Sequence, residues 1–127
     1  MADGVEQIYI ALISVHGLIR ADNLELGRDA DTGGQTLYVL ELAQALSELP
    51  NVCQVDLVTR RVIDSHVDAE YAEPIEKVND KFRIVRIEAG PDEYIYKEHL
   101  WEHLDGFADN LADFFRKQDH VPDLIHS

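Results

Sequence analysis

Apolar residues form four short runs along the chain, and stretches with helical periodicity lie between them. The run at 8–15 is continuous and rich in β-branched side chains, which is typical of a strand buried on both faces of a parallel sheet. Shorter runs at 52–59, 82–87 and 124–126 predict three further strands.

The stretch from 33 to 49 predicts the first helix. Thr32 and Gln35 have the spacing of a capping box, and Pro50 ends the helical pattern. The polar residues of this stretch fall on one narrow stripe, so we expect most of the helix surface to be buried. The stripe consists of Glu41, Gln44 and Glu48.

A second helix is predicted over about 98–117, because large apolar residues recur there at helical spacing. They are Leu100, Leu104, Phe107, Leu111 and Phe115, and we expect Trp101, Ala108 and Ala112 to widen the buried stripe. The segment 60–80 is polar and contains Pro74, which predicts a loop with at most one short helical turn.

Strands that alternate with helices predict an α/β fold with a doubly wound parallel sheet. The length of 127 residues would by itself suit one domain. However, the chain ends inside the fourth expected strand, and no helix follows to cover that edge of the sheet. We therefore expect residues 1–127 to be the N-terminal part of a longer protein.

The charge of the chain excludes some classes of partner. It has 11 Lys and Arg against 25 Asp and Glu, a net charge of −14, so neither nucleic acid nor an anionic membrane is an expected partner. The acidic N-terminus is unlike a signal peptide, and the run at 8–15 is too short to span a bilayer. Cys53, the one cysteine, cannot form an internal disulfide and is expected to be a small core residue. These features predict a soluble, cytoplasmic protein.

The strongest candidate for chemistry is the start of the first helix, which follows a long polar loop at 18–31. Ligands of open α/β sheets bind beyond the carboxyl ends of the strands. Gly33 and Gly34 would leave backbone N–H groups bare, so that a phosphate can approach closely. In the alternative interpretation, the glycines only shape a tight turn and Gln35 only caps the helix. The pattern is neither a dinucleotide fingerprint nor a Walker loop.

Several segments resemble the sucrose-phosphate synthases. The most specific is 23–35, which ends in Thr-Gly-Gly-Gln, a motif that also occurs in other retaining glycosyltransferases, including sucrose synthases. The resemblance extends over most of the chain. The other matching segments are 16–20, 38–43, 55–60, 90–91, 94–98 and 100–101.

This resemblance implies the GT-B architecture, in which two Rossmann-like domains face each other across a cleft. It implies transfer of glucose from UDP-glucose to fructose 6-phosphate with retention of configuration, which yields sucrose 6-phosphate and UDP. Residues 1–127 would be part of the N-terminal, acceptor-side domain. The C-terminal domain, which holds the nucleotide sugar and carries a pair of glutamates, would be absent from this chain. No cofactor is expected.

The resemblance also implies roles for individual residues. Gly33 and Gly34 would bring backbone amides to the donor diphosphate and the reacting sugars, and Gln35 would hydrogen-bond the acceptor. Lys97 would pair with the phosphate of fructose 6-phosphate. From the residues alone, a lysine among carboxylates is more often a solvated ion-pair partner. No catalytic residue is assigned to this chain.

The histidines give weaker signals. His16 follows the first strand and fits either a ligand contact or a turn histidine held by backbone groups. The segment 99–103 matches the zinc motif H-x-x-E-H literally, but no further ligand is evident and Leu100 and Trp101 suit an apolar stripe, so a solvated helix face is favoured over a metal site.

The sequence leaves two alternatives to a sucrose-phosphate synthase. The first is a sucrose synthase or another retaining transferase that uses a sugar or a sugar phosphate. The second is a non-enzymatic phosphorylation receiver, which needs an acidic pair after the first strand and an aspartate after the third. The corresponding segments here are 14–16, Ser-Val-His, and 87–89, Ile-Glu-Ala, so the receiver is disfavoured. We expect residues 1–127 alone to be inactive.

Overall fold

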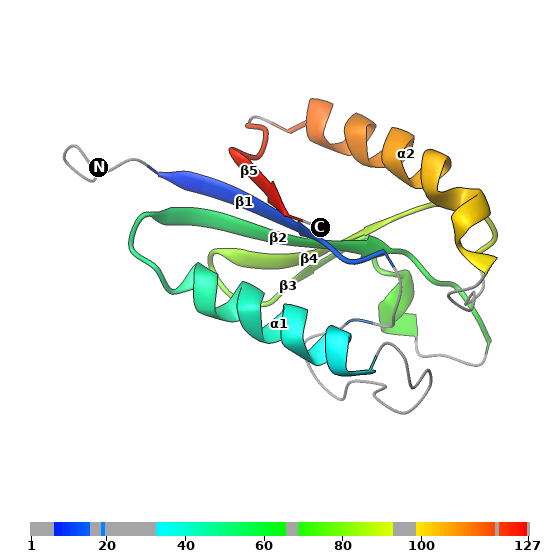
Figure 1. The fold of residues 1–127 in the computed structure, drawn as a ribbon, viewed down its shortest axis with the longest axis horizontal. Coiled ribbons are helices and arrows are strands. Elements are labelled where there is room, and N and C mark those ends of the chain that lie inside the picture. The colour runs from blue at the N-terminus through cyan, green and yellow to red at the C-terminus, as the bar shows by residue number, and fades with distance from the viewer. Residues whose placement is uncertain are drawn as a thin grey trace.

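A five-stranded sheet lies between two helices in the computed structural model (Figure 1). The structure describes residues 7–15, 19, 33–65, 69–92, 99–118 and 120–126. The strand order is β3-β4-β2-β1-β5. The strands are β1 (Ile8–Ile13), β2 (Val52–Arg60), β3 (Ile75–Lys77), β4 (Phe82–Ile87) and β5 (Leu124–His126).

Parallel pairing dominates the sheet. β1 pairs with β2 and with β5, and β2 pairs with β4, in each case in parallel. Because parallel strands point the same way, the carboxyl ends of these four strands lie along one edge of the sheet. All four strands predicted from the sequence are present.

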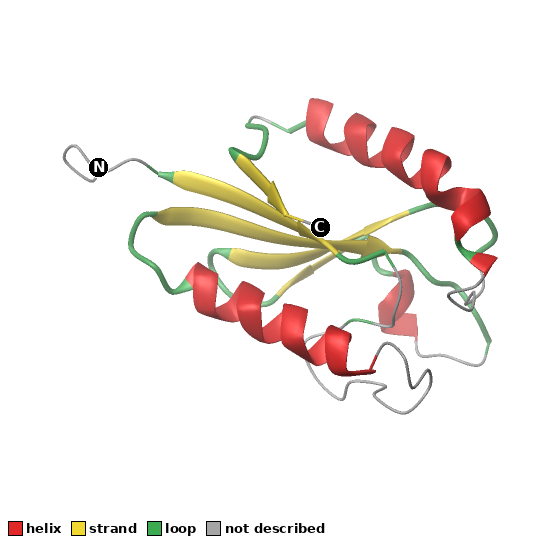
Figure 2. Cartoon of the chain, in the orientation of Figure 1, coloured by secondary structure: helices red, strands yellow, loops and turns green. Residues whose placement is uncertain are grey.

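The two helices cover opposite faces of the sheet (Figure 2). Helix α1 (Gly33–Ser47) packs through Val39 and Ala43 on one face, and helix α2 (Leu104–Arg116) packs through Phe107, Leu111 and Phe115 on the other. This is the doubly wound arrangement expected from the alternation of strands and helices. Among the described residues, no helix is long and apolar enough to cross a membrane.

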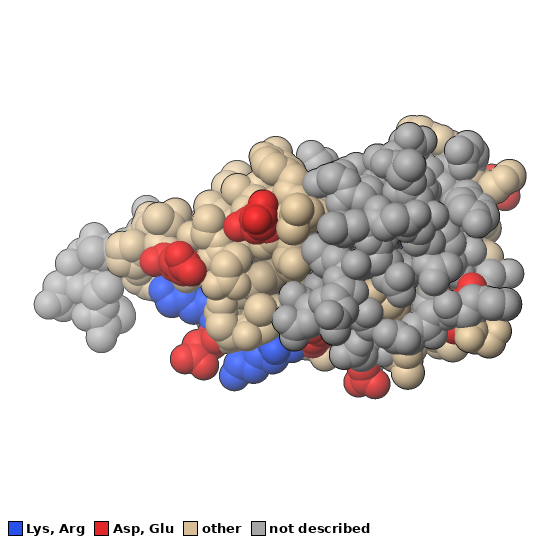
Figure 3. All heavy atoms as spheres, turned by 90° about the horizontal axis from the view of Figure 1, so that it is seen from below, with Lys and Arg blue, Asp and Glu red and all other residues tan. Residues whose placement is uncertain are grey.

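The outer surfaces of both helices are more exposed than the sequence predicts. On α1, Tyr38 is 63% exposed and Leu37 is 39% exposed, so the expectation of a mostly buried helix is wrong. Among the described residues that join β2 to β4, the one helical element is a 3-10 turn of four residues, so no long helix of this segment lies beside α1. The face seen from the α1 side carries acidic side chains next to a few basic ones in its described part (Figure 3).

The expected stripe on the second helix is also too wide. Trp101 is 76% exposed, and Ala108 and Ala112 are exposed as well, so none of them widens the core. A separate 3-10 turn, η3 (Trp101–His103), precedes α2, which therefore begins later than predicted. Trp101 lies in this separate turn and is exposed, whereas the neighbouring Leu100 is buried as expected.

The segment between β2 and β4 contains more structure than the predicted loop. The short helical turn is present as η1 (Ala69–Ala72). The edge strand β3 was missed; it pairs with β4 antiparallel, with Ile75 opposite Val85. Three residues are too few for a recognisable alternation, so the sequence pattern could not predict β3.

Cys53 is exposed, so its expected place in the core is wrong. The β1–β2 register shifts from Ile8 opposite Val52 to Tyr9 opposite Gln54, and this bulge leaves Cys53 without a pairing residue. The extra residue keeps both Val52 and Val55 in the core on the α1 side, while the thiol between them faces outward.

Gly90 ends the segment after β4 in a conformation that requires glycine. Its φ is +64°, in the left-handed region that side chains rarely adopt. A Cβ at this position would lie 2.6 Å from Cγ of His103. The turn and its packing against η3 therefore both depend on the missing side chain.

We predict that Gly90→Ala lowers the free energy of unfolding by about 1–3 kcal/mol, because it combines left-handed strain with a clash against His103. Gly106→Ala is the matched control, since nothing lies within 4 Å of its added Cβ in α2. This control is expected to stabilise the protein by about 0.5–1 kcal/mol. Urea denaturation of both variants measures the difference; equal effects would contradict this account of Gly90.

Candidate functional site

The start of α1 lies at the edge of the sheet where ligands of parallel α/β folds bind. Gly33, Gly34 and Gln35 form the first turn of this helix, directly after the connection from β1. The first N–H groups of a helix have no intrahelical partner and carry a partial positive charge, which suits an anion. The structure thus brings these three predicted ligand residues together in one turn.

Other predicted residues lie outside the described part of the chain. These are Lys97, His16 and the capping residue Thr32, and their roles stay predictions. Of the zinc-like segment, His99 is exposed and His103 packs against Gly90. Within the described ranges, no three His, Cys, Asp or Glu side chains form a group that could hold a metal ion.

Arg60 is a residue at this edge that sequence reasoning missed. It ends β2, is only 4% exposed, and donates from Nε to the carbonyl of Ala89 over 2.9 Å. Its Nη2 also donates to the carbonyl of Pro91. Arg60 therefore fixes the turn after β4, from which the chain continues toward Lys97. The available signal in the sequence is a pair of arginines, Arg60 and Arg61, at the end of an apolar strand.

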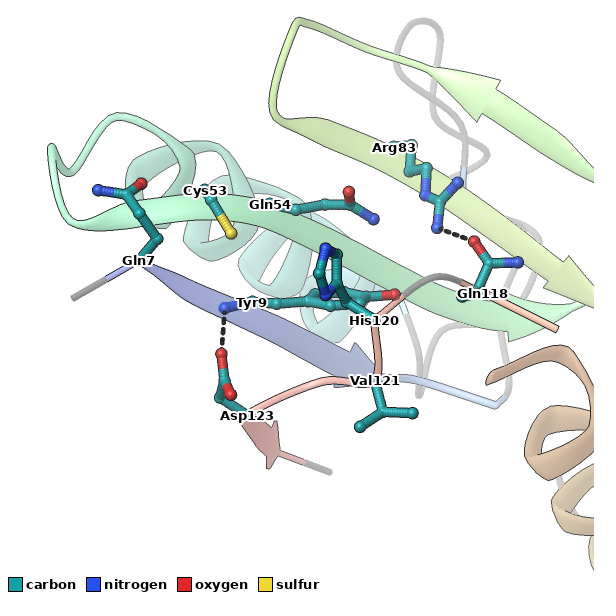
Figure 4. A pocket seen from close by; sticks show the side chains of 9 residues that line it. All are labelled: Gln7, Tyr9, Cys53, Gln54, Arg83, Gln118, His120, Val121 and Asp123. Atoms are coloured by element: carbon teal, nitrogen blue, oxygen red, sulfur yellow. Dashed lines mark hydrogen bonds between the residues drawn. The ribbon is translucent and has the colours of Figure 1, made fainter. Parts of the chain in front are cut away.

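The opposite edge of the sheet carries a cavity of about 700 Å³ (Figure 4). Its walls come from the amino ends of the strands: Tyr9 on β1, Cys53 and Gln54 on β2, and Arg83 on β4. The backbone N–H of Tyr9 donates to the carboxylate of Asp123, just before β5, over 3.0 Å. This cavity was not predicted from the sequence.

Two of the residues that line this cavity, Tyr9 and Arg83, form with the buried Asp56 a polar cluster that we call its floor, although Asp56 itself does not line the cavity. Asp56 is completely buried and accepts from Nε and Nη2 of Arg83 over 2.7 and 3.0 Å. It also accepts from the Tyr9 hydroxyl and, over 2.9 Å, from Gln54. Arg83 in turn donates to Gln118 over 3.2 Å. The polar groups of the floor are thus bonded to one another, as buried polar groups must be.

The electrostatics of this floor favour a fixed protonation state. Burial raises the pKa of Tyr9 above its ordinary value, and the hydrogen bond to Asp56 is the second largest cause of this rise. The hydrogen bond to the same carboxylate raises the pKa of Arg83, against the effect of burial. Tyr9 and Arg83 therefore stay protonated at physiological pH and serve as donors to Asp56. This arrangement stabilises the fold, and the Asp56 carboxylate is hydrogen-bonded to both side chains.

The carboxyl edge is therefore the better candidate for the functional site, although the cavity of about 700 Å³ lies at the amino edge. At the amino edge, Arg83 is already paired with Asp56, and Asp123 accepts from the backbone N–H of Tyr9. At the carboxyl edge, the first turn of α1 supplies N–H groups that the helix itself does not use.

Comparisons with known proteins decide the family. No family model matches the chain. A rice protein named probable sucrose-phosphate synthase 4 is 49% identical over 119 residues, which cover 82% of this chain. Sucrose-phosphate synthase 1 of Arabidopsis thaliana is 45% identical over 130 residues, which cover 91%. A solved sucrose-phosphate synthase from Thermosynechococcus elongatus matches with a TM-score of 0.69 and 33% identity over 94% of this chain. The chain is homologous to one segment of the sucrose-phosphate synthases.

This homology confirms the resemblance found in the sequence. The fold class is confirmed as well, because the mixed, mostly parallel sheet fits part of a Rossmann-like half of a GT-B sucrose-phosphate synthase. The chain spans 11% of the rice relative and 12% of the Arabidopsis relative. It spans 26% of the solved sucrose-phosphate synthase chain.

We predict that Asp56→Ala destabilises this sucrose-phosphate synthase homologue by about 3–5 kcal/mol, because it leaves Arg83 and the Tyr9 hydroxyl without their buried partner. Glu88→Ala is the control. This variant breaks the ion pair between Glu88 and Arg61, in which the Glu88 side chain is 63% exposed. It should lower the free energy of unfolding by about 0–1 kcal/mol. Chemical denaturation compares the two variants. If Asp56→Ala lowers the free energy of unfolding no more than Glu88→Ala does, the buried ion pair contributes little to stability.

Proposed function

We propose that this chain is part of the acceptor-side domain of a retaining glucosyltransferase. The reaction transfers glucose from UDP-glucose to fructose 6-phosphate and yields sucrose 6-phosphate and UDP. The supporting observation is the start of α1 at Gly33 and Gly34, placed at the carboxyl edge of a parallel sheet in a homologue of the sucrose-phosphate synthases.

The chemistry of the reaction suits this geometry. When glucose leaves UDP, negative charge develops on the diphosphate, and helix-end N–H groups that are already oriented stabilise it. Gly33 and Gly34 carry no side chain that would keep a phosphate or a sugar from the backbone. The side chain of Gln35, in the same turn, would hydrogen-bond the acceptor sugar.

The nucleotide sugar needs a second domain. In this proposal, residues 1–127 supply part of one wall of the cleft, and a C-terminal Rossmann-like domain supplies the uridine contacts and the paired glutamates. The chain by itself is then inactive. We place the reaction in the cytoplasm, which agrees with a single cysteine that cannot form an internal disulfide.

A chimera tests the proposed function. The part of this chain that matches the rice relative, 82% of its length, replaces the matching segment there, and sucrose 6-phosphate formation from UDP-glucose and fructose 6-phosphate is measured. We predict transfer by this chimera. Gly34→Val should reduce transfer by about a hundredfold or more without unfolding it, because the side chain occupies space that the ligand needs. A folded chimera that binds UDP-glucose but transfers nothing would contradict the proposed function. A fully active Gly34→Val variant would show that the glycines only shape a tight turn.

Lys97→Ala tests the phosphate contact in the same chimera. We predict that its KM for fructose 6-phosphate rises about 10- to 100-fold, because a charge-assisted contact to a dianion is lost, while the KM for UDP-glucose is unchanged. Lys81→Ala, at the amino end of β4, is the control and should have no effect. If turnover of fructose and of fructose 6-phosphate falls equally, Lys97 does not bind the phosphate.

The unaccompanied chain tests the division between domains. We predict no measurable binding of UDP-glucose by residues 1–127 in calorimetric titration. One helix end in an open, solvated half-cleft lacks the low-dielectric surroundings that strengthen such contacts. Stoichiometric binding at micromolar concentration would place the donor site in this chain and reverse the proposed roles of the domains.

A further inference from the structure

Strand β4 carries two arginines that point to opposite faces of the sheet. Arg83, near the amino end, lies on the α2 side and binds Asp56. Arg86, near the carboxyl end, follows three residues later and therefore lies on the α1 side. The first belongs to the stabilising network of the amino edge, whereas the second lies at the edge of the proposed site.

Arg86 joins three separate segments of the chain. Its Nη2 donates to the carbonyl of Ile19 over 2.8 Å and to the carboxylate of Glu76 over 2.7 Å. Its Nη1 donates to the carbonyl of Glu73 over 3.1 Å, and the guanidinium lies 6.0 Å from the ring centre of Tyr71. The bond to Ile19 reaches across 67 positions of sequence, from β4 to the connection between β1 and α1.

The burial of Arg86 makes these contacts costly to lose. Its side chain is 1% exposed, and a cation taken out of water is tolerated only where acceptors surround it. Two of its acceptors are backbone carbonyls, which a planar, forked guanidinium can reach together and a single ammonium nitrogen cannot. Arg86 is therefore suited to fixing the position of backbone rather than only to forming an ion pair.

Unused donors remain beside these contacts. Nε of Arg86 and the hydroxyl of its register partner Thr59 are buried without a hydrogen-bond partner among the described residues. The same is true of the Ser14 hydroxyl. The backbone N–H of Ser14 donates to the carbonyl of Val58 and extends the β1–β2 ladder to this row. Buried donors that the fold leaves unsatisfied are destabilising, and natural proteins retain them chiefly at functional sites.

We propose that Arg86 is a positioning residue for acceptor binding: it holds the backbone of Ile19, in the connection between β1 and α1, against the carboxyl edge of the sheet. It touches no reacting atom and acts through the backbone that it holds. The identity of the acceptor rests on the proposed function, whereas the hold on Ile19 does not.

Hydrogen exchange of the 127-residue chain tests the hold on Ile19. In Arg86→Lys, peptides that contain Ile19 should exchange about tenfold faster, because one or both carbonyl contacts are lost. Peptides from α2 should be unchanged. Arg83→Lys is the matched control on the same strand and should leave the Ile19 peptides as they are. Glu76→Gln, which removes the ion pair but keeps the carbonyl contacts, should have a smaller effect than Arg86→Lys.

Kinetics in the chimera test the consequence for the acceptor. Arg86→Lys should raise the KM for fructose 6-phosphate about tenfold and leave the KM for UDP-glucose unchanged, and Arg83→Lys should change neither. Unchanged exchange at Ile19, faster exchange throughout the chain, or an equal effect of Arg83→Lys would overturn the proposal. A chimera without transfer activity would contradict the proposed function, and the exchange experiment would still decide the role of Arg86.

Discussion

The parallel pairing of β1 with β2 and of β2 with β4 is the constraint on which the rest of the structure depends. It places the carboxyl ends of these strands side by side, so that their connections all leave from one edge. Helix α1 must then begin at that edge, because it follows β1 and runs back across the sheet. The position of Gly33 and Gly34 is thus a consequence of strand direction.

The two edges of the sheet use arginine in different ways. At the amino edge, Arg83 is held by side chains, Asp56 and Gln118, in a network that closes on itself. At the carboxyl edge, Arg60 and Arg86 donate to backbone carbonyls of the turn after β4 and of the connection after β1. The first arrangement stabilises the sheet, and the second fixes the connections that border the proposed site.

The regular elements could be predicted from the sequence because their signals are local. The β-branched run of β1 and the i, i+4, i+8 spacing of Phe107, Leu111 and Phe115 each specify an element without reference to distant residues. The exposure of Cys53 could not be predicted, because it depends on a bulge in pairing with β1. Helical spacing also predicts a buried Trp101, whereas this residue lies exposed in a 3-10 turn before α2.

The candidate site was only partly accessible to sequence reasoning. The glycines at the start of α1 have a recognisable motif, whereas Arg60 and Arg86 become informative only when their acceptors are known. Those acceptors, the carbonyls of Ala89 and Ile19, lie 29 and 67 positions away. Contacts of this kind arise from the tertiary fold and leave no spacing pattern in the chain.

The central claim is that ligand binds at the carboxyl edge, at the start of α1. A titration of the isotope-labelled chain with fructose 6-phosphate, followed through its backbone amide resonances, tests this most directly. The account predicts shifts of the Gly33, Gly34 and Gln35 amides, with those of Tyr9 and Gln54 unchanged. Shifts confined to Tyr9, Gln54 and their neighbours at the amino edge would contradict it.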